Sequence, residues 1–251
     1  MSLSCSNLPS VTLTNGVKII KQYAFNWSSL DSVYFPESVI KIEGGAFAGC
    51  SQLSRLVMDA SNPVFDSRDN CNAIVRTATN TLFMGCKESI IPSSVTHIGD
   101  SAFYGCSGLN SIDIPSSVTS IGKYAFAGCS SLSSIDISNA VISIGNWTFA
   151  NCTGLSSITI PGSVTSIGSE TFTNCSDLTS IVVEAGNTVY DSRDNCNAII
   201  RTATNEIVRG CQSTVIPSSV TTIGYMAFSH CGGLTTLTIP ALPARRIVVV
   251  R

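Results

Sequence analysis

The sequence predicts a β-rich solenoid of stacked 23-residue coils, and three observations predict it. Phenylalanine recurs in one local context with a period of about 23 residues. Two of the intervals between these phenylalanines are longer than the period by 33 residues. The segment Asp66–Asn80 also returns almost unchanged as Asp191–Asn205. The offset of 125 residues equals one long interval and three short ones, so the chain carries two copies of a four-coil block. Short fixed periods indicate stacked units rather than one globular core. The repeated phenylalanines, at intervals of 22, 56, 23, 23, 23 and 56 residues, are Phe25, Phe47, Phe103, Phe126, Phe149, Phe172 and Phe228.

Each coil contains the pattern L-x-x-I-x-I, as in Leu109, Ile112 and Ile114. The alternation at its end predicts a strand with one buried face. Pro115 then ends the strand, because proline has no N–H to donate to a neighbouring coil. The following S-V-T-S-I-G predicts a second extended stretch, whose glycine is expected to allow the next turn. The Ala-Phe or Thr-Phe pair is expected to point inward, so that rings stack from coil to coil.

The two 33-residue inserts, at about 59–91 and 184–216, are predicted to be part of the architecture because they repeat. Each begins with an Asn/Asp-rich turn and continues as a hairpin, NAIVRT paired with TLFMGC in the first copy. The solenoid is expected to span residues 11–240, after an N-terminal segment 1–10. In the tail 241–251, ALPARRIVVVR replaces the repeat. We expect this apolar tail either to cover the last coil or to pair with another chain.

Composition excludes several functions. Only 12% of the 251 residues are charged and the net charge is −2, so the chain lacks the basic surface that nucleic acids or anionic membranes require. No apolar run approaches the ~20 residues needed to span a bilayer. The first ten residues, MSLSCSNLPS, do not have the pattern of a signal peptide.

The consensus C-x-x-L-x-x-I-x-I-P-x-x-V-T-x-I-G-x-x-A-F resembles the BspA-type, or Treponema-like, leucine-rich repeat. The resemblance covers about Val11 to Pro240. It implies a right-handed, horseshoe-like leucine-rich repeat solenoid and an extracellular, cell-surface protein. It also implies adhesion to a host extracellular matrix or cell-surface protein, or to a glycan. The family contributes no catalytic residues and no cofactor.

Cysteine occupies one position of the repeat, which predicts a buried ladder of small apolar thiols. The ladder residues are Cys50, Cys106, Cys129, Cys152, Cys175 and Cys231. Four further cysteines belong to the inserts. A hairpin centred on Ala78-Thr79 places Cys71 opposite Cys86, and the same geometry applies to Cys196 and Cys211. Disulfides are therefore geometrically allowed, with free thiols as the alternative.

No set of residues predicts catalysis, a metal site or a cofactor. His97 and His230 are not equivalent repeat positions, and no nucleophile motif is present. The insert does contain a dense group of oxygen-bearing side chains, Asp66, Asp69, Asn70 and Asn72. Its spacing is not that of an EF-hand, so we interpret it as a turn in which Arg68 pairs with an aspartate.

The predicted function is therefore recognition. Outward positions of the central strands are small and hydroxyl-rich, whereas tight protein interfaces favour aromatic residues and arginine. Such side chains gather toward the N-terminus at Tyr34, Arg55 and Val57, and the inserts add Arg68 and Arg193. These five residues are the candidate ligand contacts, and the Ser/Thr face is expected to be passive or weakly glycan-binding. The alternative is a structural spacer with no ligand of its own.

Overall fold

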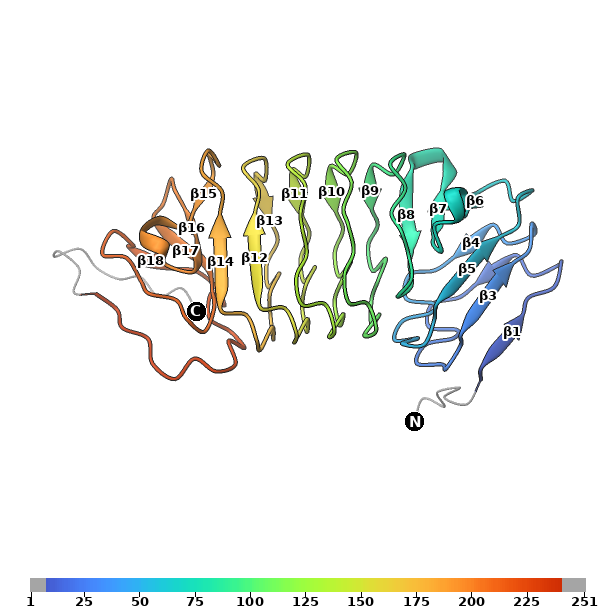
Figure 1. Cartoon of the computed structure of the whole chain (residues 1–251), viewed down its shortest axis with the longest axis horizontal. Coiled ribbons are helices and arrows are strands. Elements are labelled where there is room, and N and C mark those ends of the chain that lie inside the picture. The colour runs from blue at the N-terminus through green and yellow to red at the C-terminus, as the bar shows by residue number, and fades with distance from the viewer. Residues whose placement is uncertain (1–7, 241–251) are drawn as a thin grey trace.

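The structure, a computed structural model that describes residues 8–240, is an elongated solenoid with its coils stacked along one axis (Figure 1). The L-x-x-I-x-I segments form parallel pairs in which each residue lies beside its counterpart in the next coil. Tyr34 pairs with Val57, for example, and Thr159 pairs with Val182. These strands are β1 (Ser10–Thr12), β3 (Ser32–Phe35), β5 (Arg55–Met58), β12 (Ser157–Ile160) and β14 (Ser180–Val183).

The S-I-G segments form a second row of short parallel strands. Their register again follows the repeat, so that Ser120 pairs with Ser143 and Ile121 pairs with Ile144. The predicted division into two extended stretches is confirmed in the coils where both rows form strands, whereas Asp113 and Asp136 of two central coils make only an isolated bridge in the first row. The strands of this row are β2 (Ile19–Ile20), β4 (Lys41–Ile42), β9 (His97–Ile98), β10 (Ser120–Ile121), β11 (Ser143–Ile144), β13 (Ser166–Ile167) and β18 (Thr222–Ile223).

A stack of phenylalanine rings runs through the central coils, as predicted. The ring centroids of Phe103 and Phe126 are 5.1 Å apart, those of Phe126 and Phe149 are 5.6 Å apart, and those of Phe149 and Phe172 are 5.5 Å apart. The planes are nearly parallel and all four side chains are buried. Each ring therefore fills the space that its two neighbouring coils leave, which makes adjacent coils depend on one another.

Glycine is required after each second strand for a reason that the sequence did not indicate. A Cβ atom on Gly145 would lie 2.6 Å from the backbone nitrogen of Lys123, and one on Gly168 would lie 2.4 Å from that of Asn146. Neither glycine has a positive φ. Glycine is therefore needed because the backbones of consecutive coils approach closely here, and not because the turn requires an unusual conformation.

Each insert folds as a small antiparallel unit that extends the second row of strands. In the first insert β6 (Phe65–Asp66) pairs with β7 (Ile74–Arg76), and β7 pairs with β8 (Thr81–Met84), which then lies parallel to β9. The second insert repeats this arrangement with β15 (Tyr190–Asp191), β16 (Ala198–Arg201) and β17 (Glu206–Gly210) beside β18. The predicted hairpin is confirmed, and β6 and β15 add a third strand to it. Short 3-10 turns η1 (Arg68–Asn70), η2 (Thr77–Thr79) and η3 (Arg193–Asn195) complete the inserts.

The inserts divide the solenoid into three packed segments. Buried apolar side chains form separate clusters before, between and after the hairpins. At the first junction Gly85 of the hairpin donates its N–H to the carbonyl oxygen of Ala102 at 2.8 Å. In the uninterrupted coils the corresponding carbonyl accepts from the preceding phenylalanine, as when Phe103 donates to Ala125. The hairpin thus takes one hydrogen-bonding position of the second turn, whereas Gly49 of that turn still donates directly to the carbonyl oxygen of Tyr104 in the third.

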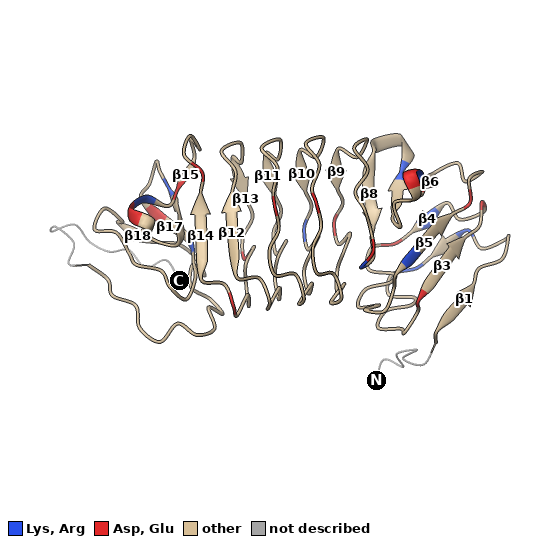
Figure 2. Cartoon of the chain, viewed as in Figure 1, with Lys and Arg blue, Asp and Glu red and all other residues tan. Residues whose placement is uncertain are grey.

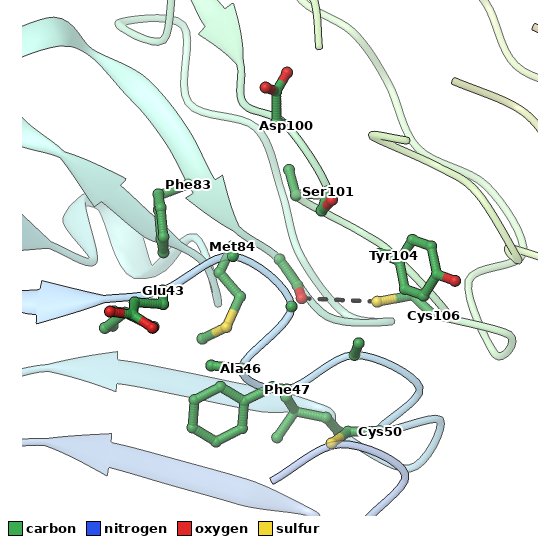
Figure 3. A pocket seen from close by; sticks show the side chains of 17 residues that line it. Glu43, Ala46, Phe47, Cys50, Phe83, Met84, Asp100, Ser101, Tyr104 and Cys106 are labelled. Carbon is green, nitrogen blue, oxygen red and sulfur yellow. Dashed lines mark hydrogen bonds between the residues drawn. The ribbon is translucent and has the colours of Figure 1, made fainter. Parts of the chain in front are cut away.

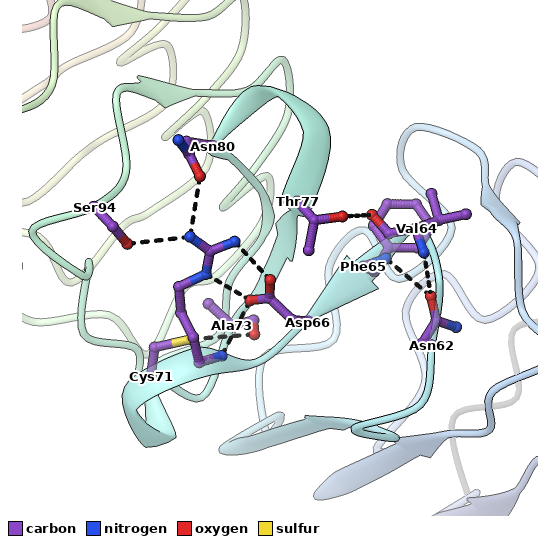
Figure 4. A network of polar contacts seen from close by, with 10 residues as sticks. Asn62, Val64, Phe65, Asp66, Cys71, Ala73, Thr77, Asn80 and Ser94 are labelled. Carbon is purple, nitrogen blue, oxygen red and sulfur yellow. Dashed lines mark hydrogen bonds and ion pairs between the residues drawn. The ribbon is translucent and has the colours of Figure 1, made fainter.

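An asparagine anchors the start of each insert, buried in the first (Figure 4) and half-buried in the second. The Nδ2 atom of Asn62 donates to the carbonyl oxygens of three residues of the previous coil, at 2.7–3.3 Å. Its Oδ1 atom accepts from the backbone N–H groups of Val64 and Phe65, both at 2.9 Å. Asn187 makes the same kinds of contact in the second insert. One amide side chain therefore satisfies backbone groups on both sides of the coil boundary.

Replacing Asn62 with alanine is expected to lower the free energy of unfolding by roughly 1–3 kcal/mol, because it leaves buried backbone groups without partners. Urea denaturation followed by circular dichroism measures the change. Asn187→Ala should have a similar effect, whereas Asn110→Ala, at an exposed position of a central coil, should have almost none. Equal stability of the Asn62 and Asn110 variants would contradict the anchoring role.

The expected tail at 241–251 and the first seven residues lie outside the described residues.

Candidate functional site

The candidate contact residues at the N-terminal end lie side by side on two parallel strands. Tyr34 on β3 pairs with Val57 on β5, and Ser32 pairs with Arg55, which places Arg55 two positions from Val57 on the same outward face. The Tyr34 side chain is 49% exposed and Arg55 is exposed as well. The inward positions, such as Val33 and Leu56, are buried. The alternation of the strands thus presents one aromatic, one aliphatic and one cationic side chain together.

The first insert fixes the position of Tyr34. The Tyr34 hydroxyl donates a 2.5 Å hydrogen bond to Oδ2 of Asp59, the residue that follows β5. This bond raises the pKa of Tyr34 and lowers the pKa of the Asp59 carboxyl, since it stabilises the protonated phenol and the ionised carboxylate. The hydrogen bond therefore fixes the hydroxyl end of the Tyr34 ring, and about half of the side chain remains exposed to a ligand.

Arg68 and Arg193 point into their own inserts. Arg68 donates to both carboxylate oxygens of Asp66, at 2.8 and 2.6 Å, and to Oδ1 of Asn80 at 3.0 Å. Arg193 makes the equivalent contacts with Asp191 and Asn205. The expected pairing of the arginine with an aspartate is confirmed, and the guanidinium groups hold the turn together. Figure 2 shows these charged pairs flanking the central coils at the two inserts.

The insert cysteines are not paired. Cys71, Cys86, Cys196 and Cys211 are free and buried. A bulge between Ile74 and Val75 shifts the hairpin register by one residue, so Cys86 faces Asn72 rather than Cys71. Accordingly, Cys86 Sγ donates to the carbonyl oxygen of Asn72 at 3.2 Å. The second hairpin has the same shift, and there too the sulfur of Cys211 donates to Asn197. The register that allowed a disulfide is therefore not the one that forms.

The repeat cysteines form the predicted ladder. Cys129 Sγ donates to the carbonyl oxygen of Phe103, and Cys152 Sγ donates to that of Phe126, at 3.3 and 3.1 Å. Burial raises the pKa of these thiols well above the ordinary value. All ladder members are buried except Cys231, which is partly exposed. The thiols are thus structural donors with little thiolate character.

An aromatic cleft at the junction of the first insert was not predicted from the sequence. The cleft has a volume of about 390 Å³ and lies in the turns that follow the second strands. Its floor is made by small residues of two turns, Gly45 and Ser101, and Figure 3 shows Ser101 and Tyr104 at this junction. Tyr23 lies at one end, and Tyr104 and Tyr124 lie at the other. The lining also includes Gln22 and Gly44.

A signal for this cleft is present in the sequence. The residue two positions before each repeated phenylalanine forms the outer edge of the turn. Along the chain this position reads Tyr23, Gly45, Ser101, Tyr124, Trp147, Glu170 and Met226. Two small residues between aromatic ones indicate a gap in an aromatic row. The gap becomes a cleft beside the point where Gly85 of the hairpin takes the place of the second turn at the carbonyl oxygen of Ala102.

Other candidate chemistry is not assembled in residues 8–240. No group of three or more His, Cys, Asp or Glu side chains in this range is placed to hold a metal ion. Asp113 and Asp136 are neighbours across an isolated bridge, and both are exposed. His97 and His230 are exposed and far apart in the repeat. In the part of the chain that is described, no helix has the length and apolar character of a membrane span.

Comparison with known families identifies the repeat. Six copies of the BspA type leucine rich repeat region match residues 3–72, 76–200 and 205–245. The chain belongs to this family. No curated protein sequence matches the chain significantly. The predicted fold class, a leucine-rich repeat solenoid, is thus confirmed by both the coordinates and the family.

Three solved structures share the fold of this chain. A leucine-rich repeat protein from Eubacterium ventriosum is 22% identical with a TM-score of 0.64, over 91% of this chain and 60% of that one. A leucine-rich cell surface protein from Faecalibacterium prausnitzii is 24% identical with a TM-score of 0.56, over 92% and 61%. The pneumococcal vaccine antigen PcpA is 20% identical with a TM-score of 0.56, over 92% and 53%. The BspA-like chain therefore spans only about three fifths, or less, of these structures.

Proposed function

We propose that this BspA-like chain is a non-enzymatic recognition module, displayed at a cell surface, that binds a host extracellular matrix or cell-surface protein, or a glycan. The single observation that carries the proposal is the group formed on neighbouring strands by the exposed Tyr34 and Arg55 and the half-buried Val57. Family membership and the similarity to a protein described as a cell surface protein support the location. A repeated, open surface suits the capture of an extended partner.

The group has the composition of a protein-binding hot spot. Tyrosine and arginine contribute most strongly to protein interfaces because they combine apolar contact area with directed hydrogen bonds. The hydrogen bond from Tyr34 to Asp59 limits the motion of the ring, so less conformational entropy is lost on binding. Arg68 and Arg193 hold the turns of their own inserts together and do not supply free cationic groups.

The test is a paired substitution in a binding assay on immobilised host matrix proteins. Tyr34→Ala with Arg55→Ala is expected to reduce binding about 10-fold or more, since each is placed as a hot-spot residue. Ser134→Ala with Ser157→Ala, on the exposed central strand face, should leave binding unchanged. Loss of binding in the serine pair with full binding in the Tyr34/Arg55 pair would contradict the assignment.

The second candidate function is a structural spacer that presents other domains. It is favoured by the central coils, whose outward face carries mostly serine and threonine. A spacer should retain no matrix protein specifically in a pull-down, whereas a recognition module should retain one that the Tyr34/Arg55 variant loses.

A further inference from the structure

We infer that the aromatic cleft at the first insert junction binds a neutral oligosaccharide, with pyranose rings stacked on Tyr104 and Tyr124. The inference deepens the proposed recognition function by adding a second site with its own ligand class. It lies on the turns that follow the second strands, whereas the Tyr34 group lies on the first row of strands.

The aromatic rings of the cleft are open rather than buried in the core. Tyr23 is 54% exposed, Tyr104 is 37% exposed and Tyr124 is 36% exposed. Tyr124 stacks on Trp147 with centroids 5.1 Å apart and an interplanar angle of 2°, and Tyr104 meets Tyr124 edge-on at 6.3 Å. The rings therefore support one another and hold a fixed platform before any ligand arrives, which reduces the entropic cost of binding.

The backbone of this turn position is left-handed whichever side chain occupies it, with φ values of 59° at Ser101, 55° at Glu170 and 52° at Met226. Tyr23, Tyr124 and Trp147 have φ values of 59°, 56° and 54°, in the left-handed region that favours glycine or asparagine. The turn itself therefore requires this conformation, and the aromatic side chains are not needed to form it. Gly45 takes the same position in the next turn, where a Cβ atom would lie 2.9 Å from the Tyr23 ring. The close approach of Tyr23 to Gly45 lets the ring border the cleft without filling it.

The same junction at the second insert has no such cleft, so the architecture alone does not create it. There the two floor positions hold Glu170 and Met226 instead of glycine and serine. The space that remains is about 200 Å³ and is lined by charged residues, including Arg201, Glu206 and Arg209. The first junction thus differs from the second by both a small floor and aromatic walls.

Charge and polarity select the ligand class. Glu43, beside the floor, is paired with Lys21 at 3.3 Å and Lys41 at 3.2 Å, and its pKa is lowered to about 2 by a hydrogen bond from the Gln22 backbone and by these lysines. Asp100 Oδ1 accepts a 2.8 Å hydrogen bond from the backbone of Lys123. None of the residues that line the cleft is charged, so the cleft favours a neutral ligand over an acidic or basic one.

A pyranose ring matches this lining. It has an apolar face of C–H groups that packs against an aromatic ring, and a rim of hydroxyls that both donate and accept hydrogen bonds. The cleft offers tyrosine hydroxyls, the Ser101 hydroxyl and the Gln22 amide beside its rings. Its volume falls within the roughly 300–1,000 Å³ of small-molecule sites, which combine apolar walls with a few polar groups.

The test titrates the whole chain with cellohexaose, laminarihexaose, maltohexaose, xylohexaose and chitohexaose by calorimetry and by tryptophan fluorescence, since Trp147 stacks on Tyr124. At least one of these should bind with a Kd below about 1 mM. Tyr104→Ala with Tyr124→Ala should weaken that binding about 10-fold or more. The matched control is Tyr225→Ala, an exposed tyrosine at the second junction, which should leave affinity unchanged.

Ser101→Tyr tests the site without removing a ring. Ser101 has a φ of 59°, and Tyr124 shows that this turn position accepts tyrosine, so the variant should fold with an unchanged melting temperature. It should nevertheless lose binding, because the new ring fills the cleft. The inference is overturned if no neutral hexasaccharide binds, if Ser101→Tyr binds fully, or if only a heparin hexasaccharide or an apolar peptide binds. Failure of the oligosaccharide inference can be distinguished from failure of the proposed function, because binding to matrix proteins is measured separately with the Tyr34/Arg55 variant.

Discussion

Phe126→Ala is expected to lower the free energy of unfolding by ~3–5 kcal/mol, because truncating a buried aromatic side chain removes its transfer free energy and leaves a cavity. Phe126 is fully buried and stacks on Phe103 and Phe149, so neither neighbour can move far enough to fill the space. Urea denaturation measures the loss. Hydrogen exchange should accelerate first in the coils on either side of Phe126, since solenoid units interact mainly with their neighbours.

The control for this variant is Ile142→Ala, which shortens an apolar side chain in the same coil region that is 51% exposed. Its effect should stay within about 0.5 kcal/mol. A loss at Phe126 of less than about 1 kcal/mol would show that the ring stack does not hold the coils together.

The ladder thiols should react with a maleimide or an aromatic disulfide at least 1,000-fold more slowly, as an order of magnitude, in the folded chain than in urea, because the thiolate is the reactive form. Cys129 and Cys152 are fully buried, and burial holds their pKa far above the usual range. Burial also raises the pKa of Cys175 to about 12. Among the ladder thiols Cys231, which is partly exposed, should react first, and Cys231→Ser should remove this thiol's contribution to the fast phase.

Alkaline pH should destabilise the fold through the same thiols. Their pKa is higher in the folded chain than in the unfolded one, so their contribution to stability is complete below about pH 8.5, the pKa of an unfolded cysteine. As the pH rises above this value the unfolded chain loses protons that the folded chain keeps, and stability falls. Urea midpoints that do not decrease between pH 8 and pH 11, or ladder thiols that all react at the unfolded rate, would contradict this account.

Much of the candidate surface could be predicted from the sequence, because strand alternation determines which residues face outward. The period of 23 placed Tyr34 beside Val57, and the pairing register confirms this. The aromatic cleft could not be found in this way. Tyr23 and Tyr124 are 101 residues apart, and they line one cleft beside the point where Gly85 of the hairpin contacts Ala102.

The sequence by itself determined the repeating parts of this protein: the two rows of strands, the phenylalanine stack and the cysteine ladder. A fixed period gives equivalent residues equivalent surroundings, so one coil predicts the others. Only the tertiary structure decided the features at the inserts. The bulge before Val75 turned Cys86 away from Cys71, and the N–H of Gly85 took the carbonyl of Ala102 that a stacked coil would have used. These outcomes depend on one-residue shifts in register and on contacts between distant segments, which local sequence patterns do not specify.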